Sequence, residues 1–141
     1  VKTPNDVICM TEDGEIYSIS AAQTYGDYKA ASLTRPAHID RWIKEFVNLS
    51  YIDHFHAVYD PVLRAVKFFV VRNGKTQVDT ALVYFIDRPV KEAWVVHDNE
   101  NYPSGYSASC SAVVRKSEGN WKVYTGDYSG QIWELETVNK N

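Results

Sequence analysis

Two histidines, His54 and His56, lie two positions apart in a segment that the sequence predicts to be a strand. Because the side chains of a strand alternate between its faces, both imidazoles should point the same way, as two ligands of one metal ion would. A zinc site needs a third and usually a fourth ligand, and nothing in the pattern places His38 or His97 near this pair. Val58 would share the same face, which favours ordinary packing, so we predict no metal and no cofactor.

The run Gly105-Tyr106-Ser107-Ala108-Ser109 is superficially similar to the Gly-x-Ser-x-Gly turn that carries the nucleophile of serine hydrolases. Its last position is Ser109 instead of glycine. The residues that follow are expected to form a strand, whereas a nucleophile turn leads from a strand into a helix. We therefore predict no catalytic serine.

Three acidic residues, Asp87, Asp98 and Glu100, are close enough in sequence to supply the two carboxylates of a glycosidase. Asp87 directly precedes Arg88-Pro89, which predicts a turn, and residues 98–101 are typical of a solvated loop. We therefore expect ordinary surface carboxylates and predict that the protein is not an enzyme.

Tyr102, Tyr106 and Tyr128 fall in predicted loops. Exposed aromatic side chains serve both sugar binding and protein interfaces. A glycan- or receptor-binding site formed by Tyr102 and Tyr106 is therefore an alternative functional hypothesis. Packing of these tyrosines between loops is the structural interpretation.

The composition excludes several classes of protein. Apolar residues make up 45% of the 141 residues and charged residues 23%, which is typical of one globular domain or of a fragment of a larger one. The net charge of −3 argues against nucleic-acid binding and against an anionic membrane surface. No apolar run approaches the roughly 20 residues of a membrane span. Val1 is not a start methionine and no signal peptide is visible, so we expect a chain cut from something longer.

Nine short strands and one helix should position these residues. Asp13-Gly14 and Asn73-Gly74 are strong hairpin-turn signals, and Asp13, Asp60 and Asp127 are expected to organise turns through side-chain hydrogen bonds to backbone N–H groups. The strands are predicted over residues 7–10, 15–19, 54–59, 65–71, 80–86, 93–97, 109–115, 121–125 and 131–136. An amphipathic helix is predicted over 34–48, with Thr34 as its N-cap and Pro36 in its first turn, and a loop over 21–33.

Apolar residues occupy both faces of the strands predicted over residues 65–71 and 80–86. In residues 65–71, Val66, Phe68 and Val70 share one face, while Phe69 and Val71 share the other. Strands that are apolar on both sides are expected to be covered on both sides, as in stacked sheets or propeller blades. The two cysteines, Cys9 and Cys110, are far apart in sequence and are predicted to be buried and unpaired, in a reducing compartment.

A short internal repeat also favours a propeller. The segments 14–19 and 130–135 share the pattern Gly-x-Ile-aromatic-x-aliphatic, and each comes second in a predicted hairpin. A blade has four strands in about 40–45 residues. We therefore interpret residues 1–141 as one β-propeller segment: a hairpin of a preceding blade (7–19), an inserted helix (34–48), a full blade (54–97) and an incomplete next blade (109–136). Such a chain should be part of a larger propeller or complete one by oligomerisation, because rings need roughly four to eight blades.

The strand motifs resemble those of β-propeller proteins in the virions of tailed bacteriophages. The similar motifs are Tyr59-Asp60, Leu82-Val83-Tyr84, Trp94, Tyr25-Gly26, the 14–19 segment and the closing hairpin Gly126-Asp127-Tyr128-Ser129-Gly130-Gln131-Ile132-Trp133. The resemblance implies a structural part of a tail hub, nozzle or head–tail connector, made in the cytoplasm of the bacterial host. Its partners would be other virion proteins and copies of itself, with no direct readout of nucleic-acid sequence and no membrane.

Overall fold

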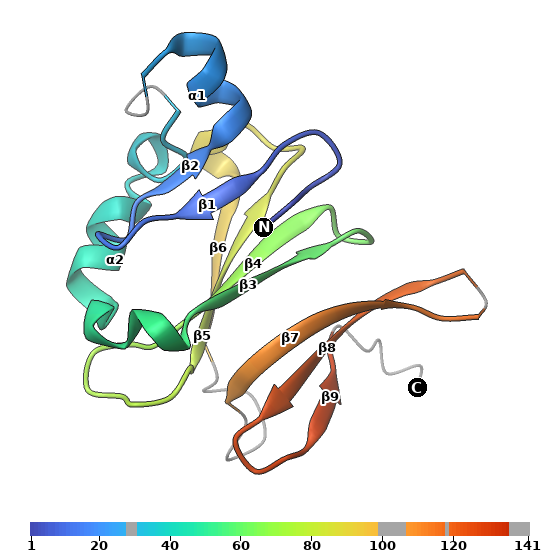
Figure 1. Ribbon diagram of the computed structural model, residues 1–141. Helices are drawn as coiled ribbons and strands as arrows, with labels where there is room; N and C mark the ends of the chain where they lie inside the picture. The colour runs from blue at the N-terminus through green and yellow to red at the C-terminus, as the bar shows by residue number, and fades with distance from the viewer. Residues whose placement is uncertain (28–30, 99–106, 118, 136–141) are drawn as a thin grey trace.

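The computed structural model describes residues 1–27, 31–98, 107–117 and 119–135 of the chain. Within these residues the backbone forms nine strands in three antiparallel sheets, together with two α-helices and three short 3-10 helices (Figure 1). The fold class is therefore mostly β, as the sequence predicts.

The three sheets follow one another along the chain. The first sheet is the hairpin of β1 (Ile8–Met10) and β2 (Ile16–Ser18). The second sheet contains β3 (His56–Asp60), β4 (Ala65–Val70), β5 (Thr80–Phe85) and β6 (Trp94–Asp98). The third sheet contains β7 (Ala108–Arg115), β8 (Trp121–Asp127) and β9 (Ile132–Glu134). Consecutive strands are neighbours in every sheet, which short hairpin connections favour.

All nine predicted strands are present in the described residues, with boundaries that differ by about two residues or fewer. The predicted hairpin turns are also present, because Gly14 and Gly74 adopt the positive φ angles of 81° and 80° that such turns require. Local turn chemistry and apolar patterning were therefore sufficient to locate the strands.

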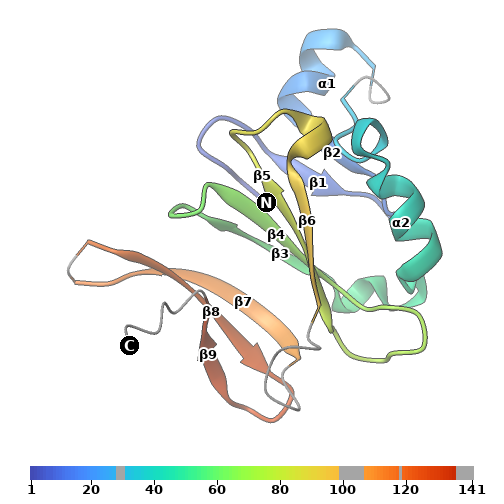
Figure 2. The same cartoon turned by 180° about the vertical axis from the view of Figure 1, so that it is seen from behind.

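The second sheet lies between the other two (Figures 1 and 2). One cluster of apolar side chains joins it to the first sheet, and we call this contact the first–second interface; it includes Ile8, Ile16, Val66, Phe68, Val70, Leu82 and Tyr84. A separate cluster joins it to the third sheet, and we call this contact the second–third interface; it includes Val58, Phe69, Val71, Ala108 and Val123. The expectation that both faces of β4 are covered is confirmed, since every residue of β4 is buried.

The helical content differs from the prediction of a single helix. A second α-helix, α1 (Ile19–Tyr25), occupies part of the 21–33 segment, so the prediction of a loop there was wrong for its first residues. Ser18 caps α1 by accepting a hydrogen bond from the N–H of Ala21, and Gly26 ends it with φ +65°. No side chain of α1 is buried, and the helix therefore shows no amphipathic period in the sequence.

The helix predicted over 34–48 is shorter than expected. It is α2 (Ile39–Phe46), and a separate 3-10 helix, η1 (Arg35–Ala37), precedes it. His38 has φ +59° and separates the two. Thr34 is not the N-cap of α2, because its side chain is buried and donates instead to Oε2 of Glu15 at 2.9 Å. The apolar face of α2 packs against the first–second interface through Ile43.

No sheet of the described residues closes on itself. The interpretation of 7–19, 54–97 and 109–136 as propeller blades therefore stays a proposal. Among the described residues, no helix is both long and apolar enough to cross a membrane.

The prediction that both cysteines are buried was wrong. Both are free thiols, but Cys110 is exposed and Cys9 is only partly buried. The reason is register: Cys110 pairs with Gly126 on the face of the third sheet that points away from the second sheet. Cys9 lies on the face of β1 opposite the buried Ile8.

Candidate interaction surface

The first and third sheets contain the same hairpin. The pairs in β1–β2 are Ile8↔Ser18, Cys9↔Tyr17 and Met10↔Ile16, and the pairs in β8–β9 are Tyr124↔Glu134, Thr125↔Trp133 and Gly126↔Ile132. Each residue of the second set comes 116 positions after its counterpart in the first. The short sequence repeat is therefore a structural repeat with one common register.

The turns of the two hairpins are equivalent as well. The N–H of Gly14 donates to the carbonyl oxygen of Thr11 at 3.0 Å, and the N–H of Gly130 donates to that of Asp127 at 3.2 Å. Both glycines have positive φ, 81° and 85°. The backbone of the repeat is therefore conserved through the turn, where a residue with a side chain would be strained.

The polar pair that supports each turn is exchanged between the two copies. In the first hairpin the hydroxyl of Thr11 donates to the carboxylate of Asp13. In the second, the carboxylate occupies the first position: Asp127 Oδ1 accepts from the hydroxyl of Ser129 at 2.7 Å. The hydroxyl and the carboxylate have exchanged positions while the backbone of the turn is the same. The two sequences are therefore similar in the strand that follows the turn but differ within the turn.

Asp127 accepts more than one hydrogen bond. Its Oδ2 accepts from Trp133 Nε1 at 2.8 Å, and its Oδ1 accepts from the N–H groups of Ser129 and Gln131 at 2.9 Å each. These donors, Trp133 first, lower the pKa of the Asp127 carboxyl to about 2. The expectation that aspartates organise turns through backbone N–H groups is confirmed for Asp127 and for Asp60, which accepts from the N–H of Val62 at 3.0 Å. Asp13 supports its turn by accepting from the hydroxyl of Thr11.

Equivalent isoleucines of the two hairpins have opposite environments. Ile16 is 0% exposed, because its face of the first sheet packs on the second sheet. Ile132 is 78% exposed, because its face of the third sheet points away from the second. The same repeat position is therefore fully covered in one copy and bare in the other.

The bare side of the third sheet is the candidate interaction surface, and we call it the open face. Its residues share one side of the sheet by register: Cys110, Ala112, Val114, Lys122, Tyr124, Gly126, Ile132 and Glu134. At its centre Gly126 has no side chain, and the Sγ of Cys110 occupies the space above it: a Cβ added to Gly126 would lie only 2.9 Å from that sulfur. Small and aliphatic side chains form most of it, which suits packing against another sheet.

One end of the open face carries an ordered group of charges. Glu134 accepts from Lys116 Nζ at 2.9 Å and from the hydroxyl of Tyr124 at 2.7 Å, and its other oxygen lies 3.0 Å from Lys122 Nζ. The bond from Lys116, then those from Tyr124 and Lys122, lower the pKa of Glu134 to about 2. The carboxylate thus stays ionised at neutral pH and holds both lysines in place.

The second–third interface contains a buried ion pair. Lys67 is 2% exposed, and its Nζ lies 3.4 Å from Oδ2 of Asp60. A crevice of about 410 Å³ opens beside this pair, lined by the β3–β4 turn and the start of β8, including Val62, Leu63 and Trp121. Its described lining is largely apolar, and the one carboxylate in that lining, Asp60, is engaged with Lys67 and with the turn.

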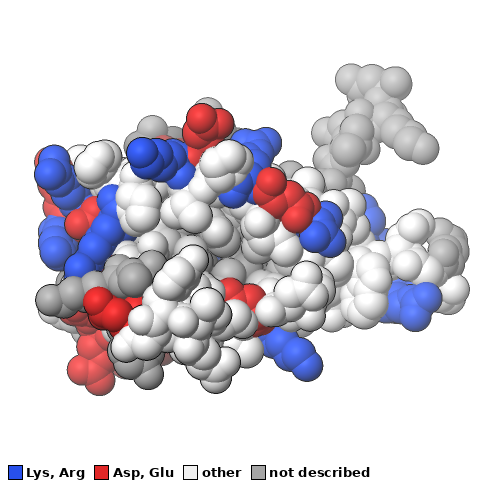
Figure 3. Space-filling view, turned by 90° about the horizontal axis from the view of Figure 1, so that it is seen from above, with Lys and Arg blue, Asp and Glu red and all other residues white. Residues whose placement is uncertain are grey.

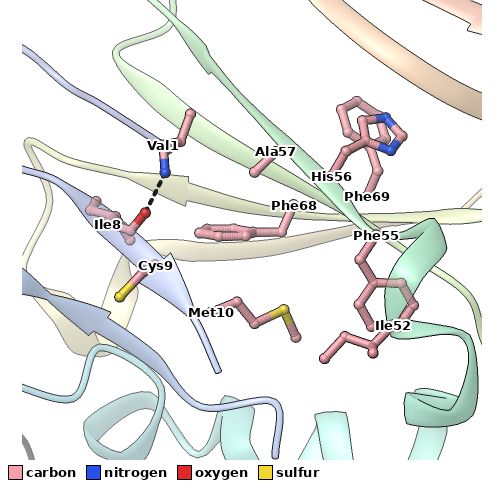
Figure 4. A pocket seen from close by; sticks show the side chains of 10 residues that line it. All are labelled: Val1, Ile8, Cys9, Met10, Ile52, Phe55, His56, Ala57, Phe68 and Phe69. Atoms are coloured by element: carbon pink, nitrogen blue, oxygen red, sulfur yellow. Dashed lines mark hydrogen bonds between the residues drawn. The ribbon is translucent and has the colours of Figure 1, made fainter. Parts of the chain in front are cut away.

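A second cavity, of about 270 Å³, lies between β1 and β3 (Figure 4). The side chains of Met10, Phe55 and Phe68 lie around it, while the thiol of Cys9 points away from Phe68 (Figure 4). Phe68 belongs to the first–second interface, so this cavity is a packing defect of that interface.

The two histidines are not arranged as metal ligands. His54 ends the 3-10 helix η2 (Leu49–His54), so the expectation that both lie on one strand was wrong. His54 Nδ1 lies 3.3 Å from the hydroxyl of Tyr128. The His56 ring instead stacks on the ring of Phe69, with 4.7 Å between the ring centroids. Among the described residues no group of three or more His, Cys, Asp or Glu side chains could hold a metal ion.

His56 is largely enclosed at the second–third interface. Its Nε2 is buried and has no hydrogen-bond partner among the described residues. Burial lowers the pKa of the His56 imidazole, more than its contact with the carbonyl of His54 raises it.

The other candidate residues are also separated. Of the nucleophile-like run, the Ser107 hydroxyl donates to the carbonyl of Val78 and that of Ser109 to the carbonyl of Gly126, at 3.0 Å in the second case. The strand expected after Ser107 is β7. Asp87 pairs with Arg64 at the surface, and Asp98 ends β6. Tyr102, Tyr106 and Glu100 lie outside the described residues, so the glycan-site hypothesis stays a prediction.

The surface charges do not form a single-sign patch on the face seen in Figure 3, where basic and acidic side chains are interspersed. This agrees with the net charge of −3.

Comparison of the chain with protein-family models, with curated protein sequences and with solved structures gave no match.

Sequence reasoning missed the open face, although it predicted the strands that form it. Which residues share a face depends on register, and the β-bulge between Ala108 and Cys110 changes the register of β7. The internal repeat was the available signal, because it makes Ile132 the counterpart of Ile16.

Proposed function

We propose that the protein is a structural component of a bacteriophage virion, a β-propeller segment of the tail or the head–tail connector, that acts through protein–protein contacts and not through catalysis. The observation that carries this proposal is the stack of three antiparallel sheets with an apolar outer side. Among the residues that the structure describes, the second sheet is covered on both faces and the third on only one.

The side-chain chemistry of the described residues supports an architectural role. The buried carboxylates are engaged in local structure: Glu15 accepts from Thr34, Asp79 from Arg72, and Asp127 from the β8–β9 turn. A catalytic acid or base would need a reachable, poised group in a cleft. In the larger crevice, the single carboxylate of the described lining, that of Asp60, is paired with Lys67.

Immunogold labelling of intact virions would test the proposal. Antibodies against the purified chain should label the tail or the head–tail junction of the phage that encodes it. Labelling confined to unassembled protein, with virions unlabelled, would contradict a structural role. Hydrolysis of a glycan substrate, lost in Asp98→Asn, would instead support the glycosidase hypothesis.

A further inference from the structure

The two equivalent hairpins contact the second sheet with opposite faces. The first sheet contacts the second with the face that carries Ile16. The third sheet contacts the second with the opposite face of the same hairpin, the one that carries Thr125 and Trp133. The counterpart of Trp133 in the first hairpin is Tyr17, which is partly exposed and lies on the face of the first sheet opposite to that of Ile16.

The outer faces of the first and third sheets therefore correspond to the two kinds of face that pack on the second sheet inside the chain. At one end the open face presents Ile132, the counterpart of the Ile16 that is buried against the next sheet. At the other end the first sheet presents Cys9 and Tyr17, the counterparts of the Thr125 and Trp133 that pack against the preceding sheet. We call this second surface the rear face; it consists of the exposed Val7 and the partly exposed Cys9 and Tyr17, and the buried Glu15 lies beside Tyr17 on the same side of the chain.

We propose that two copies of this chain associate head to tail, with the open face of one packed on the rear face of the next. The interface would continue the stacking already present twice within the chain. This inference depends on the proposed function and specifies its contact surface.

The exposed residues at the two ends fit this arrangement. Ile132 and Val114 are exposed aliphatic side chains on the open face, and Val7 is one on the rear face. Exposed β-sheet faces of this kind are normally covered in the assembled state. A head-to-tail contact uses two different surfaces, so it can repeat and form a ring or a filament.

A pair of single substitutions tests the inference. Ile132→Arg places a charge on the open face, and Cys9→Arg places one on the rear face. We expect each variant alone to be monomeric by light scattering at concentrations where the unmodified chain is assembled. An equimolar mixture should form a dimer and nothing larger, because each variant retains one intact face and the two intact faces are different.

A matched control separates a specific contact from a general effect of charge. Val62 is 66% exposed in the β3–β4 turn, outside both faces, so Val62→Arg should assemble as the unmodified chain does. Circular dichroism and the melting temperature of each variant establish that it is folded. If a variant does not fold, short bifunctional thiol cross-linking of the unmodified chain provides the second measurement, and it should join Cys9 of one copy to Cys110 of the next.

The outcomes distinguish this inference from the proposed function. Assembly of Ile132→Arg, a mixture that stays monomeric, or exclusive Cys110–Cys110 cross-links would overturn the head-to-tail contact. Virion labelling could still succeed in each of those cases, and the open face would then belong to another virion protein. Unlabelled virions with intact head-to-tail assembly would instead refute the virion function alone.

Discussion

Phe68 and Phe69 are neighbours in β4, are 3% and 4% exposed, and lie in two separate apolar clusters on opposite faces of the second sheet. Phe68 packs towards the first sheet and Phe69 towards the third. A single strand therefore contributes to two interfaces, and the fold has a three-layer stack in place of one central core.

Truncation of either phenylalanine should be costly. We expect Phe68→Ala and Phe69→Ala each to lower the free energy of unfolding by about 3–5 kcal/mol, the usual range for a buried aromatic side chain. Val95→Ala on the exposed edge strand β6 is the control and should stay within about 0.5 kcal/mol. Urea unfolding followed by fluorescence measures all three. A small effect of Phe69→Ala would mean that the third sheet contributes little to stability.

The two repeat hairpins allow a matched comparison of glycines. At Gly14 (φ +81°), an added Cβ would lie 2.6 Å from Cγ2 of Ile43 in α2, whereas at Gly130 (φ +85°) it would meet nothing within 4 Å. Gly130→Ala should therefore cost only the backbone strain, about 1–2 kcal/mol. Gly14→Ala should cost more, because α2 must shift as well. Equal losses in chemical denaturation would contradict the close packing of α2 on this turn.

Asp127 should make stability depend on acidity below its ordinary pKa of 3.8. Its pKa is about 2 in the folded protein, so the folded state binds fewer protons than the unfolded state in this range. The stabilisation is complete above pH 3.8 and is lost as the pH falls to about 2. We expect Asp127→Asn to lower the melting temperature at neutral pH, with a difference from the unmodified chain that shrinks in acid. Asp53→Asn, at a carboxylate whose side chain is 81% exposed, should leave the profile unchanged.

His56 should make stability depend on pH in a higher range. Burial against Phe69 lowers the pKa of its imidazole from the ordinary 6.5, so the folded state favours the neutral ring. The contribution is complete above pH 6.5 and decreases as the pH falls below it, because the unfolded chain takes up the proton first. His56→Phe should flatten the melting-temperature profile in mildly acidic buffer. A profile unchanged by this substitution would contradict the enclosure of the ring.

The sequence was informative where local chemistry determines structure. Asp-Gly and Asn-Gly steps located the hairpins, and apolar residues on both sides of residues 65–71 correctly indicated a sheet covered on two faces. It failed for α1, which buries no side chain and is defined by its caps, Ser18 and Gly26. It also failed for Thr34, whose hydroxyl serves the distant carboxylate of Glu15 instead of the adjacent helix.

The candidate surface could not be predicted from the sequence because it depends on which strands pair and in which register. Ile132 appears in the sequence as one more apolar strand residue. Its exposure follows only from its pairing with Gly126 and from the side on which Trp133 packs. The repeat with Ile16 becomes informative once the structure shows that the counterpart is buried.

The most direct test of the account is the mass of the purified chain in solution, measured by light scattering over a concentration series. Head-to-tail stacking predicts a mass above that of the monomer: one defined mass if the copies close into a ring, and a mass that rises with concentration if they form an open filament. A monomer at every concentration would contradict association between copies through the open face.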